Sequence, residues 1–170
     1  MAHGLGVKET VTGKGSVEEA LGSSAATLEE VKANTAGVLL VGMLQKHVDI
    51  HHLFTKEDAL TTFFASLVRS ERFGEGAALG RANIIIYNYL AKAGAFQRKP
   101  SGQYALDYKK MEEALSNLTA LVLQTQATGD RAFAEQFEAR YARLNADYDA
   151  DRMNLGLERI PADIRFNFKH

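Results

Sequence analysis

The stretch AATLEEVKANTAGVLLVGMLQK, residues 25–46, predicts a long α-helix at the centre of the fold. Its apolar positions recur at helical spacing, which predicts a buried face made of Leu28, Val31, Leu39, Leu40 and Met43. Two carboxylates, those of Glu29 and Glu30, lie near the start of a segment that otherwise has the composition of a core helix. This stretch is therefore expected to carry both the packing and the acidic groups of the protein.

The segments on either side of this helix also show helical start signals. Residues 7–15 are polar and contain glycines, so they are expected to form a loop. Ser16 and Glu19 have the spacing of a capping box, which predicts a short helix ending near Gly22. Thr55 is a candidate N-cap for another helix, whose apolar pairs recur every four residues: Ala59/Leu60, Phe63/Phe64 and Leu67/Val68.

The run from Ile84 to Leu90 is β-branched and could form a strand by local propensity. We interpret it as a buried helix, because the pattern continues to a glycine stop at Gly94. Residues 96–108, with Lys99-Pro-Ser-Gly102 between aromatic flanks, predict a small β-hairpin or an ordered loop.

Two further helices are expected, one capped by Asp107 and ending near Gly129, the other capped by Asp130. The second should bury one face that consists of Phe133, Phe137, Tyr141 and Leu144. The tail, residues 160–168, is expected to be extended and docked. No internal repeat or linker is apparent, so residues 1–170 are expected to form a single, mainly α-helical domain.

Composition narrows the class of protein. The chain is 46% hydrophobic and 24% charged, with a formal net charge of -1, and it lacks a basic field that would attract nucleic acid. It contains no cysteine, which excludes disulfides and thiolate metal sites and fits a reducing compartment. The sequence shows neither a signal peptide nor a run long enough to span a bilayer, so a cytoplasmic location without membrane partners is expected.

Two groups of residues are candidate metal ligands. Ala-His-Gly-Leu-Gly, residues 2–6, fits the end of a His-Glu-x-x-His zinc helix, in which case the first His-Glu would lie upstream of Met1. Read alone, His3 is more simply a turn residue, and the Glu29–Glu30 pair a solvated helix start. His47 and His51 also stand four residues apart, but Val48 occupies the position of the catalytic Glu, which favours a polar helix end.

Taken together, four segments in order resemble the C-terminal part of the zinc peptidases related to dipeptidyl peptidase III. They are AHGLG at 2–6, LEEVKAN at 28–34, the stretch from Ser66 to Phe96, and Ile160-Pro-Ala-Asp-Ile-Arg165. The resemblance covers nearly all of this chain but a third or less of a full family member. It implies a mainly α fold, the helical part of a zinc-peptidase catalytic domain, with the hairpin or loop near 96–108.

The resemblance also implies roles for individual residues. His3 and Glu30 would be zinc ligands, and Glu29 would orient the ligand imidazole. The catalytic Glu is expected upstream of Met1, so no catalytic residue is assigned within the chain. Apart from the resemblance, the guanidinium chemistry of Arg81 makes it a weaker candidate for binding a peptide carboxylate, with a surface or structural ion pair as the simpler interpretation.

Two departures from the family pattern concern the site. Asn34 stands where relatives usually carry an acid, and Leu79 where many have a histidine. The expected activity is zinc-dependent hydrolysis of short peptides, absent from the chain alone because one ligand and the base are missing. The alternatives are a non-catalytic helical scaffold or interaction module, or one half of a split enzyme. If the chain is a piece of a longer protein, it should expose apolar surface, which would favour self-association or pairing with an N-terminal part.

Overall fold

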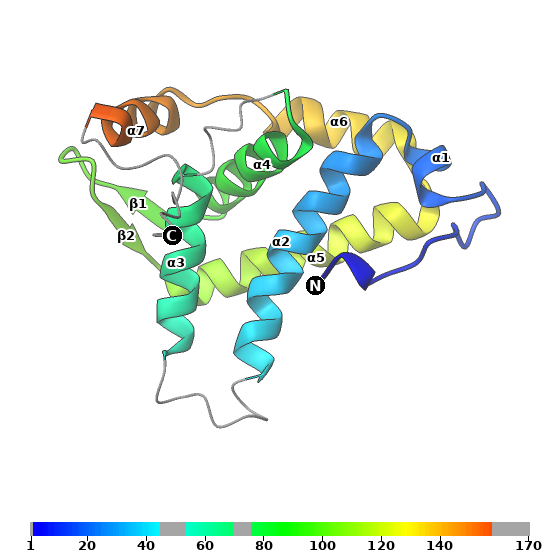
Figure 1. Cartoon of the computed structure of the whole chain (residues 1–170), viewed down its shortest axis with the longest axis horizontal. Coiled ribbons are helices and arrows are strands. Elements are labelled where there is room, and N and C mark those ends of the chain that lie inside the picture. The colour runs from blue at the N-terminus through cyan, green and yellow to red at the C-terminus, as the bar shows by residue number, and fades with distance from the viewer. Residues whose placement is uncertain (1, 45–53, 70–75, 158–170) are drawn as a thin grey trace, which may run out of the picture.

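The computed structural model describes residues 2–44, 54–69 and 76–157, and the side chains within these ranges up to Asp151. Helices dominate, as expected, with one small antiparallel hairpin (Figure 1). The elements in chain order are η1 (Ala2–Gly4), α1 (Val17–Leu21), α2 (Ser24–Leu44), α3 (Lys56–Arg69), α4 (Ala78–Lys92), β1 (Phe96–Arg98), β2 (Tyr104–Leu106), α5 (Tyr108–Thr128), α6 (Arg131–Tyr141) and α7 (Ala146–Leu157).

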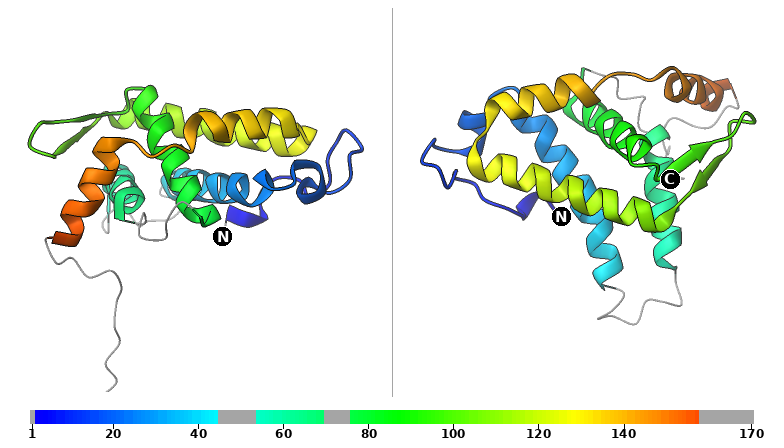
Figure 2. Two further views of the ribbon diagram at one scale, coloured as in Figure 1. Left: turned by 90° about the horizontal axis from the view of Figure 1, so that it is seen from above. Right: turned by 180° about the vertical axis from the view of Figure 1, so that it is seen from behind.

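Helix α2 crosses the middle of the structure and packs against α4 and α5, which confirms the long central helix (Figures 1 and 2). Leu28 and Val31 are fully buried in this packing. The prediction that Leu40 and Met43 belong to the buried face is wrong, since they are 36% and 57% exposed. The reason is visible in Figure 1, where the last turns of α2 extend past α5, so that α5 does not cover them. Residues 45 and 46 lie outside the described residues.

Helix α4 is surrounded by other elements, namely α2, α3, α5, α6 and β1. Its three consecutive isoleucines, Ile84–Ile86, are each at most 1% exposed. A helix that is enclosed on several sides accepts apolar residues in succession, which explains why this β-branched run is helical. Gly94, with a φ of 66°, follows the end of the helix as expected.

The hairpin β1–β2, predicted for residues 96–108, pairs Phe96 with Leu106 and Arg98 with Tyr104. It supports α7, a helix that was not predicted from the sequence. Arg98 donates two hydrogen bonds to the buried carboxylate of Asp151, at 2.8 and 2.6 Å, and Tyr104 donates a third. These bonds, together with Tyr148, which stacks on Tyr87 of the core, hold α7 against the rest of the fold.

The predicted helix starts are confirmed. Ser16 and Glu19 form the reciprocal bonds of a capping box, and the side chains of Thr55, Asp107 and Asp130 accept bonds from the first turns of α3, α5 and α6.

The expected buried face of α6 is only half correct. Phe137 and Tyr141 are buried, but Phe133 and Leu144 are 37% and 41% exposed. Leu144 follows the end of the helix at Tyr141, so the helical spacing no longer applies to it. The tail at 160–168 lies outside the described residues. None of the described helices is long and apolar enough to cross a membrane.

Two glycines offer a matched test of this packing. Gly129 ends α5 with a φ of 58°, and a Cβ there would lie 2.8 Å from Ala20 Cβ and 2.9 Å from Thr10 Cγ2. Gly129→Ala should lower the free energy of unfolding by about 3 kcal/mol, through backbone strain and overpacking. Gly37→Ala, in an open position within α2, should raise it by roughly 0.5–1 kcal/mol. Urea unfolding followed by circular dichroism measures both, and equal effects would contradict the described contact of α5 with the N-terminal loop.

Candidate functional site

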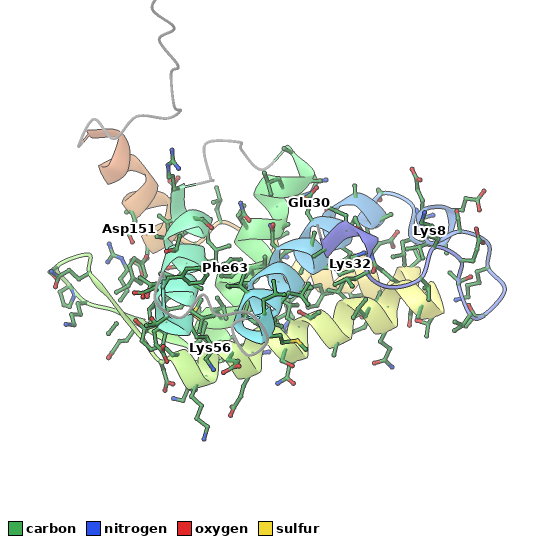
Figure 3. The ribbon with its side chains drawn as sticks, turned by 60° about the horizontal axis from the view of Figure 1, so that its bottom comes forward. Lys8, Glu30, Lys32, Lys56, Phe63 and Asp151 are labelled. Atoms are coloured by element: carbon green, nitrogen blue, oxygen red, sulfur yellow. The ribbon has the colours of Figure 1, made fainter. Side chains whose placement is uncertain are left out.

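A cluster of polar side chains forms where η1 packs against α2. His3 Nδ1 lies 3.1 Å from Glu29 Oε1. The two residues are 26 positions apart in the chain, and the fold brings them together because η1 lies alongside the first half of α2 (Figure 3). The His3 side chain is 58% exposed, so it stands at the surface with its ring held by the carboxylate.

The second oxygen of the Glu29 carboxylate, Oε2, is held by two donors. Lys32 Nζ lies 2.8 Å from it, and Gln126 Nε2, from α5, donates to it at 3.0 Å. With Oε2 occupied in this way, Oε1 is the oxygen that faces His3. The carboxylate is therefore fixed from two helices.

Lys32 is a buried cation, only 2% exposed. Besides Glu29, its ammonium donates to the backbone carbonyl oxygens of Leu5 at 2.6 Å and His3 at 3.3 Å. Three acceptors match the three protons of an ammonium, so the charge is fully hydrogen-bonded. Lys32 thus connects α2 to the backbone of the segment that carries His3 (Figure 3).

The pKa of Glu29 is lowered from its ordinary value. Burial alone would raise this pKa, but the hydrogen bonds from Lys32 and Gln126, the charge of Lys32 and the contact with His3 outweigh burial. Glu29 is therefore an ionised carboxylate at neutral pH. An ionised carboxylate can only accept a hydrogen bond, so the contact places a proton on His3 Nδ1 and leaves Nε2 of the neutral ring with a free lone pair.

Glu30 follows Glu29 directly on α2, so its side chain is turned by about 100° around the helix axis. It is half-buried, and Figure 3 shows it at the edge of α2. Within residues 2–44, 54–69 and 76–151, no three His, Asp or Glu side chains gather closely enough to hold a metal ion. The assignment of Glu30 and His3 as metal ligands thus stays a prediction.

Arg81, on α4, lies at the contact of α4 with α2. Its Nε donates to Thr27 Oγ1 at 3.2 Å and its Nη1 to the carbonyl of Gly76 at 3.3 Å. These bonds orient the guanidinium within the fold. Its role in binding a peptide carboxylate stays a prediction.

The two departures from the family pattern come together in space. Asn34 donates to Asn83 Oδ1 at 3.3 Å, which links α2 to α4. Asn34 and Leu79 both line a cavity of about 290 Å³ beside these helices. The alternative ligands His47 and His51 lie outside the described residues.

A larger cavity, of about 620 Å³, opens beside the polar cluster. His3, Glu29, Lys32 and Gln126 line one part of it, and residues 4–9, 16–18, 22, 23, 25 and 26 line the rest. The site thus combines an oriented imidazole with space for a ligand.

Two members of this cluster, Lys32 and Gln126, were not predicted from the sequence. For Lys32 a signal was available, because it falls four residues after Leu28, on the apolar side of the predicted core helix. For Gln126 there was none, since its partner is 97 residues away in the sequence.

Two solved structures contain a part with the same fold as this chain. A dipeptidyl peptidase III from Caldithrix abyssi matches 96% of the chain with a TM-score of 0.83 and 29% identity. A dipeptidyl-peptidase III from Corallococcus sp. strain EGB matches 96% with a TM-score of 0.80 and 33% identity. The chain has the fold of part of a dipeptidyl peptidase III. This confirms the resemblance and the fold class stated from the sequence.

The chain spans 31% and 30% of these two dipeptidyl peptidase III chains. A curated protein, Nudix hydrolase 3 of Arabidopsis thaliana, is 28% identical over 176 residues, which cover 98% of the chain and 22% of that protein. About four fifths of that protein lie outside the match, so its name need not refer to the part that this chain resembles. No model of a known protein family matches the chain.

Replacing Glu29 with Gln tests the electrostatics of the cluster. The change leaves the buried Lys32 without its carboxylate, and should lower the free energy of unfolding by about 2 kcal/mol at pH 7. Because folding lowers the pKa of Glu29, its stabilising contribution is complete above its unfolded pKa, about 4.3, and is lost as the pH falls through the folded value.

The stability difference between the wild type and Glu29→Gln should therefore be constant from pH 7 to about 5 and shrink at lower pH. Urea unfolding across this range measures it. Glu135→Gln, in an exposed pair with Arg131, is the control and should cost under about 0.5 kcal/mol. A difference that persists unchanged at low pH would contradict an ionised Glu29.

Proposed function

We propose that this chain forms part of the catalytic domain of a zinc-dependent peptidase of the dipeptidyl peptidase III type. In this proposal His3 and Glu30 are zinc ligands, and Glu29 orients the His3 ring. The observation that supports it is the contact of Glu29 with His3 Nδ1 inside a dipeptidyl peptidase III fold. The substrates would be short peptides, as the names of the structural relatives suggest.

The residues present fit part of a zinc site. Histidine nitrogen and carboxylate oxygen are ligands that zinc takes, and the tautomer set by Glu29 leaves His3 Nε2 free for the metal. Catalytic zinc sites usually have three protein ligands, and this chain would supply two of them, His3 and Glu30. When bound, zinc polarises the substrate carbonyl and lowers the pKa of its water ligand.

The chain's own residues have defined tasks in this proposal. Glu29 holds the His3 ring in one orientation, and the 620 Å³ cavity beside them would receive part of the peptide. Arg81 would bind a peptide carboxylate through its guanidinium, a weaker assignment because Thr27 and Gly76 already accept its hydrogen bonds. The general base would come from outside the chain.

A zinc titration tests the ligand assignment. It should be performed in a His47→Gln/His51→Gln background, which removes the competing histidine pair. With only two ligands, the chain should bind zinc weakly and should not hydrolyse a dipeptidyl arylamide. His3→Ala and Glu30→Ala should each weaken the zinc affinity further. Glu18→Ala, which alters another carboxylate that lines the cavity, is the control and should leave the affinity unchanged.

Zinc binding that is unaffected by both His3→Ala and Glu30→Ala would contradict the ligand assignment. Tight one-to-one binding or peptide hydrolysis by the chain alone would contradict the proposed need for a further ligand and base.

The origin of the base has its own test. The codons directly before Met1 should encode His-Glu in frame, and a chain extended to include them should gain zinc affinity and hydrolyse the arylamide. A stop codon directly upstream, with a ribosome-binding site before Met1, would favour a scaffold or one half of a split enzyme instead.

A further inference from the structure

We propose that Lys32 and Gln126 are positioning residues that select the metal-binding nitrogen of His3. They do so through Glu29: by occupying its Oε2, they direct its Oε1 to His3 Nδ1, so that Nε2 would be the nitrogen left for a metal. This inference rests on the proposed function and extends it from the ligands to the groups that orient them.

The contacts form a closed ring through His3. Its imidazole bonds to Glu29 Oε1, Glu29 Oε2 pairs with Lys32, and Lys32 donates back to the His3 backbone carbonyl. One ammonium therefore restrains both the backbone of His3 and the carboxylate that holds its ring. A displacement of Lys32 would release the two together.

Lys32 is suited to this task because its ammonium is buried and cannot exchange its protein acceptors for water. Its side chain is 3% exposed, and its remaining proton is accepted by the Leu5 carbonyl at 2.6 Å. This bond fixes the residue two positions after His3. The three acceptors thus lie on two segments, η1 with its following turn and α2.

Gln126 provides the second restraint, from α5. The residue is 2% exposed, and its Nε2 donates to Glu29 Oε2 at 3.0 Å. Its other polar atom, Oε1, is buried and has no hydrogen-bond partner among the described residues. A buried unpartnered carbonyl destabilises a fold, so the amide is explained by its donor end, which positions Glu29, and not by a gain in stability.

This asymmetry separates positioning from a merely structural role. Gln126→Met removes the donor to Glu29 together with the unpartnered oxygen, at similar volume. The folded state should then be as stable as the wild type or more so, while the Glu29 carboxylate keeps only Lys32 as a partner of Oε2 and can turn from His3 more easily. If Gln126 had a merely structural role, Gln126→Met would give the opposite result: a lower stability with no change in the tautomer of His3.

The experiment measures the tautomer of His3 in the metal-free chain by nitrogen-15 NMR, in alkaline buffer where imidazole side chains are neutral. The wild type should show a majority of the Nδ1-protonated form. Gln126→Met should at least halve the ratio of Nδ1- to Nε2-protonated rings, with an unchanged or higher Tm. Lys32→Met should reduce it further and lower the Tm, and Lys32→Arg should restore part of it. Gln124→Met, at an exposed position on the same helix, is the matched control and should leave the ratio and the Tm unchanged.

A wild-type tautomer ratio in folded Gln126→Met would overturn the proposal, as would a ratio in Gln124→Met that changes equally. If Lys32→Met does not fold, the tautomer ratio of His3 in Gln126→Met still tests the proposal. Because this measurement needs no metal, it is independent of the zinc titration: a shifted tautomer ratio with no zinc binding at His3 would support the positioning role and refute the proposed function.

Discussion

The ion pair between Glu29 and the buried ammonium of Lys32 is the interaction on which the site depends. Removing a cation from water is costly unless it is paired and fully hydrogen-bonded. Lys32 meets that condition only when η1, the following turn and Glu29 are all in place, since each supplies one acceptor. The burial of a single charge therefore ties the conformation of the N-terminal segment to the first half of α2.

The same pair determines what the exposed His3 can do. An imidazole at a protein surface ordinarily samples several orientations and both neutral tautomers. Here the lowered pKa of Glu29 keeps a carboxylate beside Nδ1, so one tautomer is favoured and the opposite nitrogen remains open. The packing of α2 against α4 and α5 supplies the rigid support that such an arrangement needs.

The sequence predicted those features that depend on local chemistry. The caps at Ser16, Thr55, Asp107 and Asp130 are set by residues three apart, and the helix at residues 84–90 by its length and its glycine stop. Features that depend on distant partners were not predictable. Helix α7 is held by Arg98 and Tyr104 from the hairpin, and the orientation of Glu29 by Gln126 from α5. The exposure of Met43 depends on where neighbouring helices end, which no local pattern encodes.

A crystal of the chain grown with zinc, with anomalous diffraction recorded at the zinc absorption edge, tests the central claim most directly. We expect a zinc peak about 2.0–2.2 Å from His3 Nε2 and from a carboxylate oxygen of Glu30, with Glu29 still bonded to Nδ1. A zinc ion bound to Nδ1, with Glu29 as its direct ligand, would contradict it.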